Sequence, residues 1–150
     1  MRNLLLAAAI GACLPCAAAT FRVDDSGSIP GEGQTPMRWR SLAPDRGAGS
    51  NDVEGNLLVT VRLNLAPWLN RQGRIFLVLP QQPAGQVNAE WSTQGKLIAG
   101  RVTSGNRTLV YSGPIRSPLL EDTMLLRVST DGRRLVGSQR LEFNFEIDID

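Results

Sequence analysis

Four carboxylates near the end of the chain are the residues whose spacing comes closest to a catalytic pattern. Glu142, Glu146, Asp148 and Asp150 all occupy even-numbered positions of one segment. Successive side chains of a strand point to opposite faces, so all four are expected on the same face. Paired carboxylates can work as general acid and base, but such a row is also typical of a solvated outer face. The solvated face is favoured, and the protein is predicted not to be an enzyme.

Missing residue types exclude several kinds of active site. The chain has no histidine, so neither a Ser-His-Asp nor a Cys-His nucleophilic site can form. Histidine-held zinc or copper is excluded for the same reason, and no glycine-rich phosphate loop stands between a strand and a helix. Asp24-Asp25 and Glu121-Asp122 offer oxygen ligands for calcium, but their spacing fits no known loop, and ordinary surface carboxylates are favoured. No metal and no cofactor are predicted.

Tryptophan and arginine side chains are the candidates for binding. Trp39 is flanked by Arg38 and Arg40, which an extended segment places on the opposite face, and its ring can stack on a sugar or a peptide. The favoured alternative is that Trp39 packs on a sheet while its arginines face water. Trp68 either caps one end of the fold or stands exposed as a binding anchor. Trp91 is expected in the core.

The balance of charge gives no indication of a nucleic-acid partner. The chain has 16 basic and 14 acidic residues, for a formal net charge of +2. No long run of one sign occurs, so neither nucleic acid nor an anionic membrane surface is implied. All the basic residues except Lys96 are arginine, which is attributed to genomic base composition.

Residues 1–19 are predicted to be a secretory signal peptide. Arg2 precedes an apolar run from Leu4 to Leu14, and small residues follow at positions 17–19. The run is too short to span a bilayer, no transmembrane segment follows it, and cleavage is expected after Ala19. The predicted location is the periplasm, the cell surface or the medium, with a lipid anchor at Cys13 as the minor alternative. Loss of Cys13 and Cys16 with the signal would leave no disulfide.

The rest of the chain divides into two parts. Residues 20–55 are rich in turn formers and are expected to hold one or two short strands, one of them within Met37–Leu42. Residues 56–150 alternate apolar and polar positions in short segments, with a hairpin signal at Asp131-Gly132. The pattern predicts an antiparallel β-sandwich of about 7–9 strands. Its main strands are expected at Val59–Leu65, Arg74–Leu79, Val87–Ser92, Lys96–Val102, Arg107–Tyr111, Asp122–Ser129 and Leu141–Ile149.

Four short motifs within Val87–Ile149 follow one another in a familiar order. They are Trp91-Ser92-Thr93, Tyr111-Ser112-Gly113-Pro114, the strand Asp122–Val128 and the alternating strand Leu141–Ile147. This order resembles a bacterial immunoglobulin-like (Big-type) domain, although Gly113 stands where the family usually has alanine. The resemblance covers under half of the chain. It implies an immunoglobulin-like sandwich and a surface or periplasmic module, and it says little about function because the fold hosts many roles.

Three functions stay open on this basis. The leading hypothesis is a non-enzymatic, exported binding or structural module that acts through protein contacts. A carbohydrate-binding module using Trp39 or Trp68 is the second, and a carboxylate-dependent hydrolase is the third. The closing strand Leu141–Ile149 could pair with another subunit if it lay at a sheet edge; the favoured alternative is an ordinary final strand paired inside its own domain.

Overall fold

The computed structural model describes residues 18–31, 35–41, 51–83, 85–135, 137–138 and 140–150. The predicted signal peptide, including Cys13, lies outside these residues except at Ala18 and Ala19, and it stays a prediction. No α-helix occurs in the described ranges, and therefore none that is long and apolar enough to cross a membrane.

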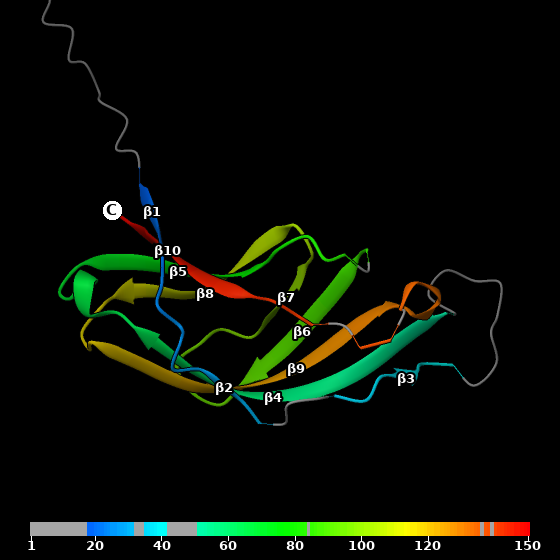
Figure 1. The fold of residues 1–150 in the computed structure, drawn as a ribbon. Helices are drawn as coiled ribbons and strands as arrows, with labels where there is room; N and C mark the ends of the chain where they lie inside the picture. Colours follow the sequence, from blue (N-terminus) through cyan, green and yellow to red (C-terminus); the bar gives the residue numbers. More distant parts are fainter. Residues whose placement is uncertain (1–17, 32–34, 42–50, 84, 136, 139) are drawn as a thin grey trace, which may run out of the picture.

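Ten strands form two antiparallel sheets that pack face to face (Figure 1). The four-stranded sheet has the order β1-β10-β5-β8, and the six-stranded sheet has the order β2-β4-β9-β6-β7 with β3 also paired to β4. The all-β sandwich predicted from the alternation is confirmed, with more strands than expected because three short ones precede β4. The strands are β1 Ala19–Arg22, β2 Ile29–Pro30, β3 Arg38–Trp39, β4 Asp52–Asn64, β5 Gln72–Leu79, β6 Val87–Thr93, β7 Gly100–Thr103, β8 Asn106–Pro114, β9 Leu119–Asp131 and β10 Asn144–Ile149.

The core lies between the sheets and is built from every second residue of the longer strands. On β4, Val59, Val61 and Leu63 are buried while their neighbours in sequence are exposed. Phe145 and Ile147 of β10 are fully buried opposite them, as expected for the closing strand. Burying a side chain of this size contributes about 1.5–3 kcal/mol. The alternation of apolar and polar residues therefore determines which face of each sheet packs in the core.

The segment from β1 to β2 closes one side of the sandwich. It leaves β10 of the four-stranded sheet and reaches β4 of the six-stranded sheet, and it crosses the gap between them in Figure 1. Val23, midway, is 1% exposed, and its amide donates to the Phe145 carbonyl at 2.8 Å. The loop-rich segment predicted for residues 20–55 thus belongs to both sheets, and the predicted boundary at residue 55 falls inside β4.

The turn from β7 to β8 closes the other side. Gly105 has a φ of +86°, a conformation that glycine adopts without steric cost. Its amide donates to the Leu79 carbonyl of β5 at 2.7 Å. The chain therefore passes from the six-stranded sheet to the four-stranded sheet within two residues.

At the end of the chain, one favoured alternative is confirmed and one expectation is corrected. The closing strand is not an edge, because β10 lies between β1 and β5; pairing inside its own domain, the favoured alternative, is what the structure has. Asp131-Gly132 does not form a tight hairpin, because β9 and β10 belong to different sheets. Instead, Asp131 caps the 3-10 turn η2 (Gly132–Arg134) by accepting a hydrogen bond from the Arg133 amide.

Truncation of the largest buried side chain of β10 tests this account of the core. Phe145→Ala is expected to lower the free energy of unfolding by about 3–5 kcal/mol, because it removes apolar contacts and leaves a cavity. Urea denaturation measures the change. Ile98→Ala is the control: its side chain is 47% exposed, and a shift within about 0.5 kcal/mol is expected. Equal effects of the two substitutions would contradict the placement of the core.

Candidate functional site

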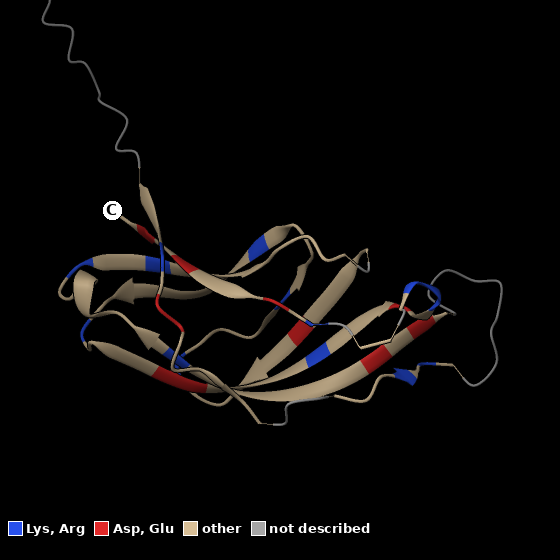
Figure 2. Ribbon diagram, viewed as in Figure 1, with Lys and Arg blue, Asp and Glu red and all other residues tan. Residues whose placement is uncertain are grey.

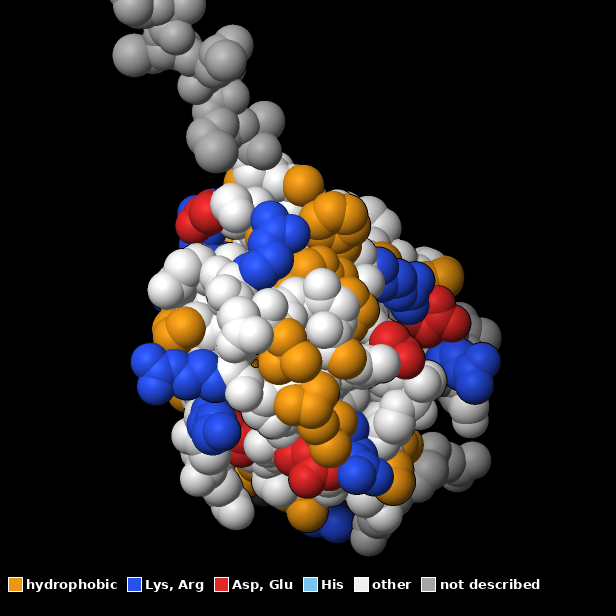
Figure 3. Space-filling view, turned by 90° about the vertical axis from the view of Figure 1, so that its left-hand side faces the viewer, with side chains coloured by type: hydrophobic (Ala, Val, Ile, Leu, Met, Phe, Trp, Pro, Cys, Tyr) orange, Lys and Arg blue, Asp and Glu red, His pale blue; other side chains and the backbone are white. Residues whose placement is uncertain are grey.

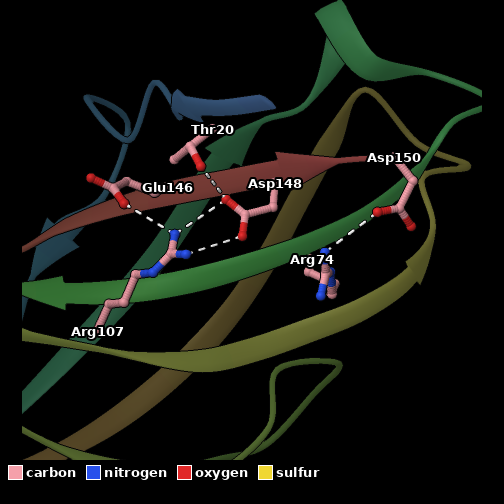
Figure 4. Close-up of polar contacts among 6 residues, drawn as sticks. All are labelled: Thr20, Arg74, Arg107, Glu146, Asp148 and Asp150. Carbon is pink, nitrogen blue, oxygen red and sulfur yellow. Dashed lines mark hydrogen bonds and ion pairs between the residues drawn. The ribbon is translucent and has the colours of Figure 1, made fainter. Parts of the chain in front are cut away.

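The carboxylates of β10 lie on the outer face of the four-stranded sheet, where arginines hold them (Figure 4). Arg107 of β8 reaches across β5 and donates to both oxygens of Asp148, from Nη1 and Nη2 at 3.1 Å each. The same guanidinium lies 3.4 Å from Glu146, and its carbon is 4.2 Å from the centre of the Phe76 ring. On the other side of β10, the Thr20 hydroxyl donates to Asp148 at 2.6 Å. We call these residues the Arg107 clamp.

The clamp explains how a carboxylate can be buried on this face. The Asp148 side chain is only 8% exposed, and burial alone raises the pKa of a carboxyl group. The hydrogen bonds from Thr20 and Arg107, together with the positive charges of Arg107 and Arg74, outweigh burial, so the pKa of Asp148 is lowered from 3.8. Bidentate arginine pairs are the strong kind of ion pair. Asp148 therefore joins β8, β10 and β1 and stays ionised near neutral pH.

Several other carboxylates singled out in the sequence have partners within the fold or lie outside β10. Asp150 pairs with Arg74 at 3.4 Å on an exposed edge, and Glu142 precedes β10. Asp122 is 7% exposed and accepts hydrogen bonds from the amides of Leu97 and Thr123, at 2.7 Å each. Asp122 thus holds a loop in place. No group of three or more potential metal ligands occurs among the described residues.

The two candidate tryptophans lie in different places, and only one is exposed. Trp68 belongs to the 3-10 turn η1 (Ala66–Trp68) and is 9% exposed, with its ring 6.0 Å from that of Phe21. It caps one end of the sandwich, which was one of its two predicted roles. Hydrophobic side chains gather down the middle of this end (Figure 3), and Leu69, next to Trp68, is 38% exposed. Trp68 is too buried to serve as a binding anchor.

Trp39 and its flanking arginines face opposite sides of the six-stranded sheet. Trp39 lies opposite Val53, whose side chain is buried, and the ring covers Gly132 so closely that a Cβ there would lie 2.7 Å from two ring carbons. The other side of the ring is in solvent, and 56% of the residue is exposed. Arg38 and Arg40 lie on the opposite face, where Arg40 pairs with Glu54 at 3.4 Å. Trp39 and the arginines therefore do not form one binding site.

Arg40 contributes instead to a shallow groove on the outer face of the six-stranded sheet. The groove has a volume of about 490 Å³ and is lined by side chains from β6, β7, β8 and β9 as well as Arg40. Glu90 of β6 lies directly opposite Arg101 on β7 and Arg127 on β9, and directly opposite residues share a face. Figure 2 shows the resulting acidic band on β6 beside a basic band on β9. We call this feature the arginine groove.

The groove carries an excess of positive charge that the described residues leave unpaired. Its lining has three arginines and one carboxylate, Glu90. Of the arginines only Arg40 has an ion pair, and the side chains of Arg101, Arg127 and Glu90 make no hydrogen bond or ion pair with any described residue. Two strand spacings, about 10 Å, separate the backbones of Arg101 and Arg127. Glu90 lies on the strand between them, so an anionic group would contact the two guanidinium groups around this carboxylate. Their planar donors match carboxylate and phosphate.

The sequence did not single out Arg101, Arg127 or Glu90. Each occupies an outward position of an alternating segment, and the sequence gives no other indication that these residues form a site. Outward charged residues are usual in any sheet, and only the pairing register brings these three into one row. The groove is therefore a property of the fold rather than of a local motif.

Comparisons of the chain with protein-family models, with curated proteins and with solved structures give no match. From its fold and candidate site, the protein is an all-β sandwich with a basic groove on the outer face of its larger sheet.

Removal of the guanidinium tests the Arg107 clamp. Arg107→Ala is expected to lower the free energy of unfolding by about 1–3 kcal/mol, because Asp148 keeps its charge and loses two donors. Arg107→Lys should fall in between, since an ammonium keeps the charge but not the bidentate contact. The control is Arg62→Ala on the other sheet, whose pair with Glu121 is exposed at both ends and should matter by at most about 1 kcal/mol. Indistinguishable denaturation curves for the two alanine variants would refute the clamp.

The lowered pKa of Asp148 predicts a pH dependence. A carboxyl group whose pKa is lower in the folded state stabilises the fold above its unfolded pKa, and that stability is lost as the pH falls through the folded pKa. The advantage of the protein over Asp148→Asn should therefore be constant above about pH 5 and shrink as the pH falls below 3.8. Urea denaturation from pH 7 down to the acid limit measures it. The difference between the two proteins isolates Asp148 from Asp131, whose pKa Arg133 lowers to about 2.

Proposed function

We propose that the protein is a non-enzymatic binding module that works outside the cytoplasm and recognises an anionic partner in the arginine groove. The observation that carries the proposal is the row Arg101-Glu90-Arg127, in which two guanidinium groups that form no ion pair with a described residue flank a single carboxylate. The same chain pairs Arg107, Arg62, Arg74 and Arg133 with carboxylates. Other exposed arginines, such as Arg22 and Arg116, also have no ion pair among the described residues, and Arg101 and Arg127 differ from them in lining one groove.

The predicted export signal supports the proposed location. Leu4 to Leu14 and the small residues at 17–19 have the order of a secretory signal. Cleavage after Ala19 would remove only the first residue of β1 (Ala19–Arg22), and it would keep Thr20, whose hydroxyl donates to Asp148. The described part of the fold is thus compatible with removal of the signal.

The two other hypotheses have less support. A carbohydrate site built on tryptophan loses Trp68, which is buried, and is left with Trp39, which is 56% exposed but whose ring packs against Gly132 and Val53. A carboxylate hydrolase would need a free pair of acids, but Asp148 and Glu146 are both bound by Arg107. Neither of these sites offers as many side chains free to contact a ligand as the arginine groove does.

Binding of a polyanion tests the proposal. Sodium poly-L-glutamate is expected to bind the full protein, more weakly as salt rises because the contacts are ionic. Arg101→Ala with Arg127→Ala should weaken binding at least tenfold, since each charge-assisted contact is worth about 1.5–3 kcal/mol. Glu90→Gln should strengthen binding, because it removes the one repulsive charge of the lining. Isothermal titration calorimetry at two salt concentrations measures all three.

The matched control removes two exposed arginines elsewhere. Arg22 lies on β1 and Arg116 lies between β8 and β9, and both are exposed. The double variant Arg22→Ala with Arg116→Ala has the same net charge as the groove variant. If the two double variants lose affinity equally, binding reflects net charge alone and the arginine groove is not a site.

A further inference from the structure

The arginine groove continues into an apolar patch on the same face of the six-stranded sheet. Leu58 of β4 and Leu125 of β9 lie directly opposite each other, and each is 49% exposed. Ile29 of β2, opposite Thr60, is 59% exposed and lies diagonally beside Leu58. Single exposed aliphatic residues are common on protein surfaces, but here three neighbours share one face. We call Ile29, Leu58 and Leu125 the aliphatic patch.

The patch and the groove have a fixed spacing because they share a strand. Leu125 and Arg127 are two residues apart on β9 and point to the same side, so their backbones are about 7 Å apart. An extended polypeptide repeats its own same-face side chains at the same interval. A segment with an acidic residue at one position and an aliphatic residue two positions away therefore matches Arg127 and the Leu58–Leu125 pair together.

From this match, and resting on the proposed function, we infer that the anionic partner is a protein segment that lies extended along β9, with acidic side chains in the arginine groove and aliphatic side chains on the aliphatic patch. Charge complementarity selects the acidic residues. The free energy gained by covering the patch comes from burying apolar surface, and this selects the aliphatic ones.

An acidic sugar fits the same face less well. Sugar rings are bound by stacking on aromatic planes, and the groove lining has no aromatic residue. The exposed aromatic ring of Trp39 belongs to the opposite side of the sheet. The hydroxyl groups of a sugar would also leave the aliphatic patch in contact with polar atoms. The combination of guanidinium and aliphatic groups therefore favours a polypeptide.

Two peptides of identical composition test the inference on the full protein. The first repeats Ser-Glu-Ser-Val, which places Glu and Val on the same face of an extended chain; the second repeats Ser-Ser-Glu-Val, which places them on opposite faces. The first should bind about tenfold more tightly, as burial of one aliphatic side chain predicts. Leu58→Ser with Leu125→Ser should abolish this preference and leave poly-L-glutamate binding unchanged, while the exposed Leu69→Ser serves as the control.

The outcomes separate the inference from the proposed function. Equal affinity for the two peptides, lost in Arg101→Ala with Arg127→Ala, would overturn the inference and leave the anion site standing. If an oligogalacturonate binds as tightly as the first peptide, the inference is overturned, the anion site stands, and an acidic sugar is the ligand. Self-association that Leu58→Ser with Leu125→Ser abolishes would identify a second copy as the occupant and also overturn it. If Arg101→Ala with Arg127→Ala weakens the binding of none of the probes, both the inference and the proposed function are overturned.

Discussion

Burial of every second side chain between two sheets is the constraint on which the rest of this structure depends. Val59, Val61 and Leu63 of β4 face Phe145 and Ile147 of β10 across the core. With the inward positions committed to packing, charged residues are confined mostly to the outward positions. The charged groups that could contact a ligand therefore lie mostly on the two outer faces, one on each sheet.

The two outer faces use arginine in different ways. On the four-stranded sheet, Arg107 is bound by Asp148 and Glu146, and its guanidinium carbon lies 4.2 Å from the centre of the Phe76 ring. A guanidinium held in this way contributes to stability and has little capacity left for a ligand. On the six-stranded sheet, Arg101 and Arg127 have no such partner among the described residues. Arg107 reaches across β5 to Asp148 and Glu146, whereas Glu90 lies directly opposite Arg101 and Arg127 and bonds to neither side chain.

The sequence predicts the parts of the fold that follow from local alternation. The sandwich, the buried Trp91 and the inward row of β10 are all confirmed, since each depends on a period of two within one strand. The short strands β1, β2 and β3 have no buried residue, so their sequences carry no alternation to detect. The arginine groove depends on residues from distant segments, and pairing register cannot be deduced from any one of them. Of the candidate site residues, only Arg40 lines the groove.

The first described strand is completed by the last one. Thr20 bonds to Asp148 across 128 positions of the chain, and β1 pairs with β10 along its whole length. Contacts between residues so far apart in sequence form late and slowly, because a long loop must close before they are made. The smaller sheet can therefore reach its final order only after β1 and β10 have met. Until β10 is available, β1 has no strand to pair with in the described part of the chain, and the four-stranded sheet stays incomplete.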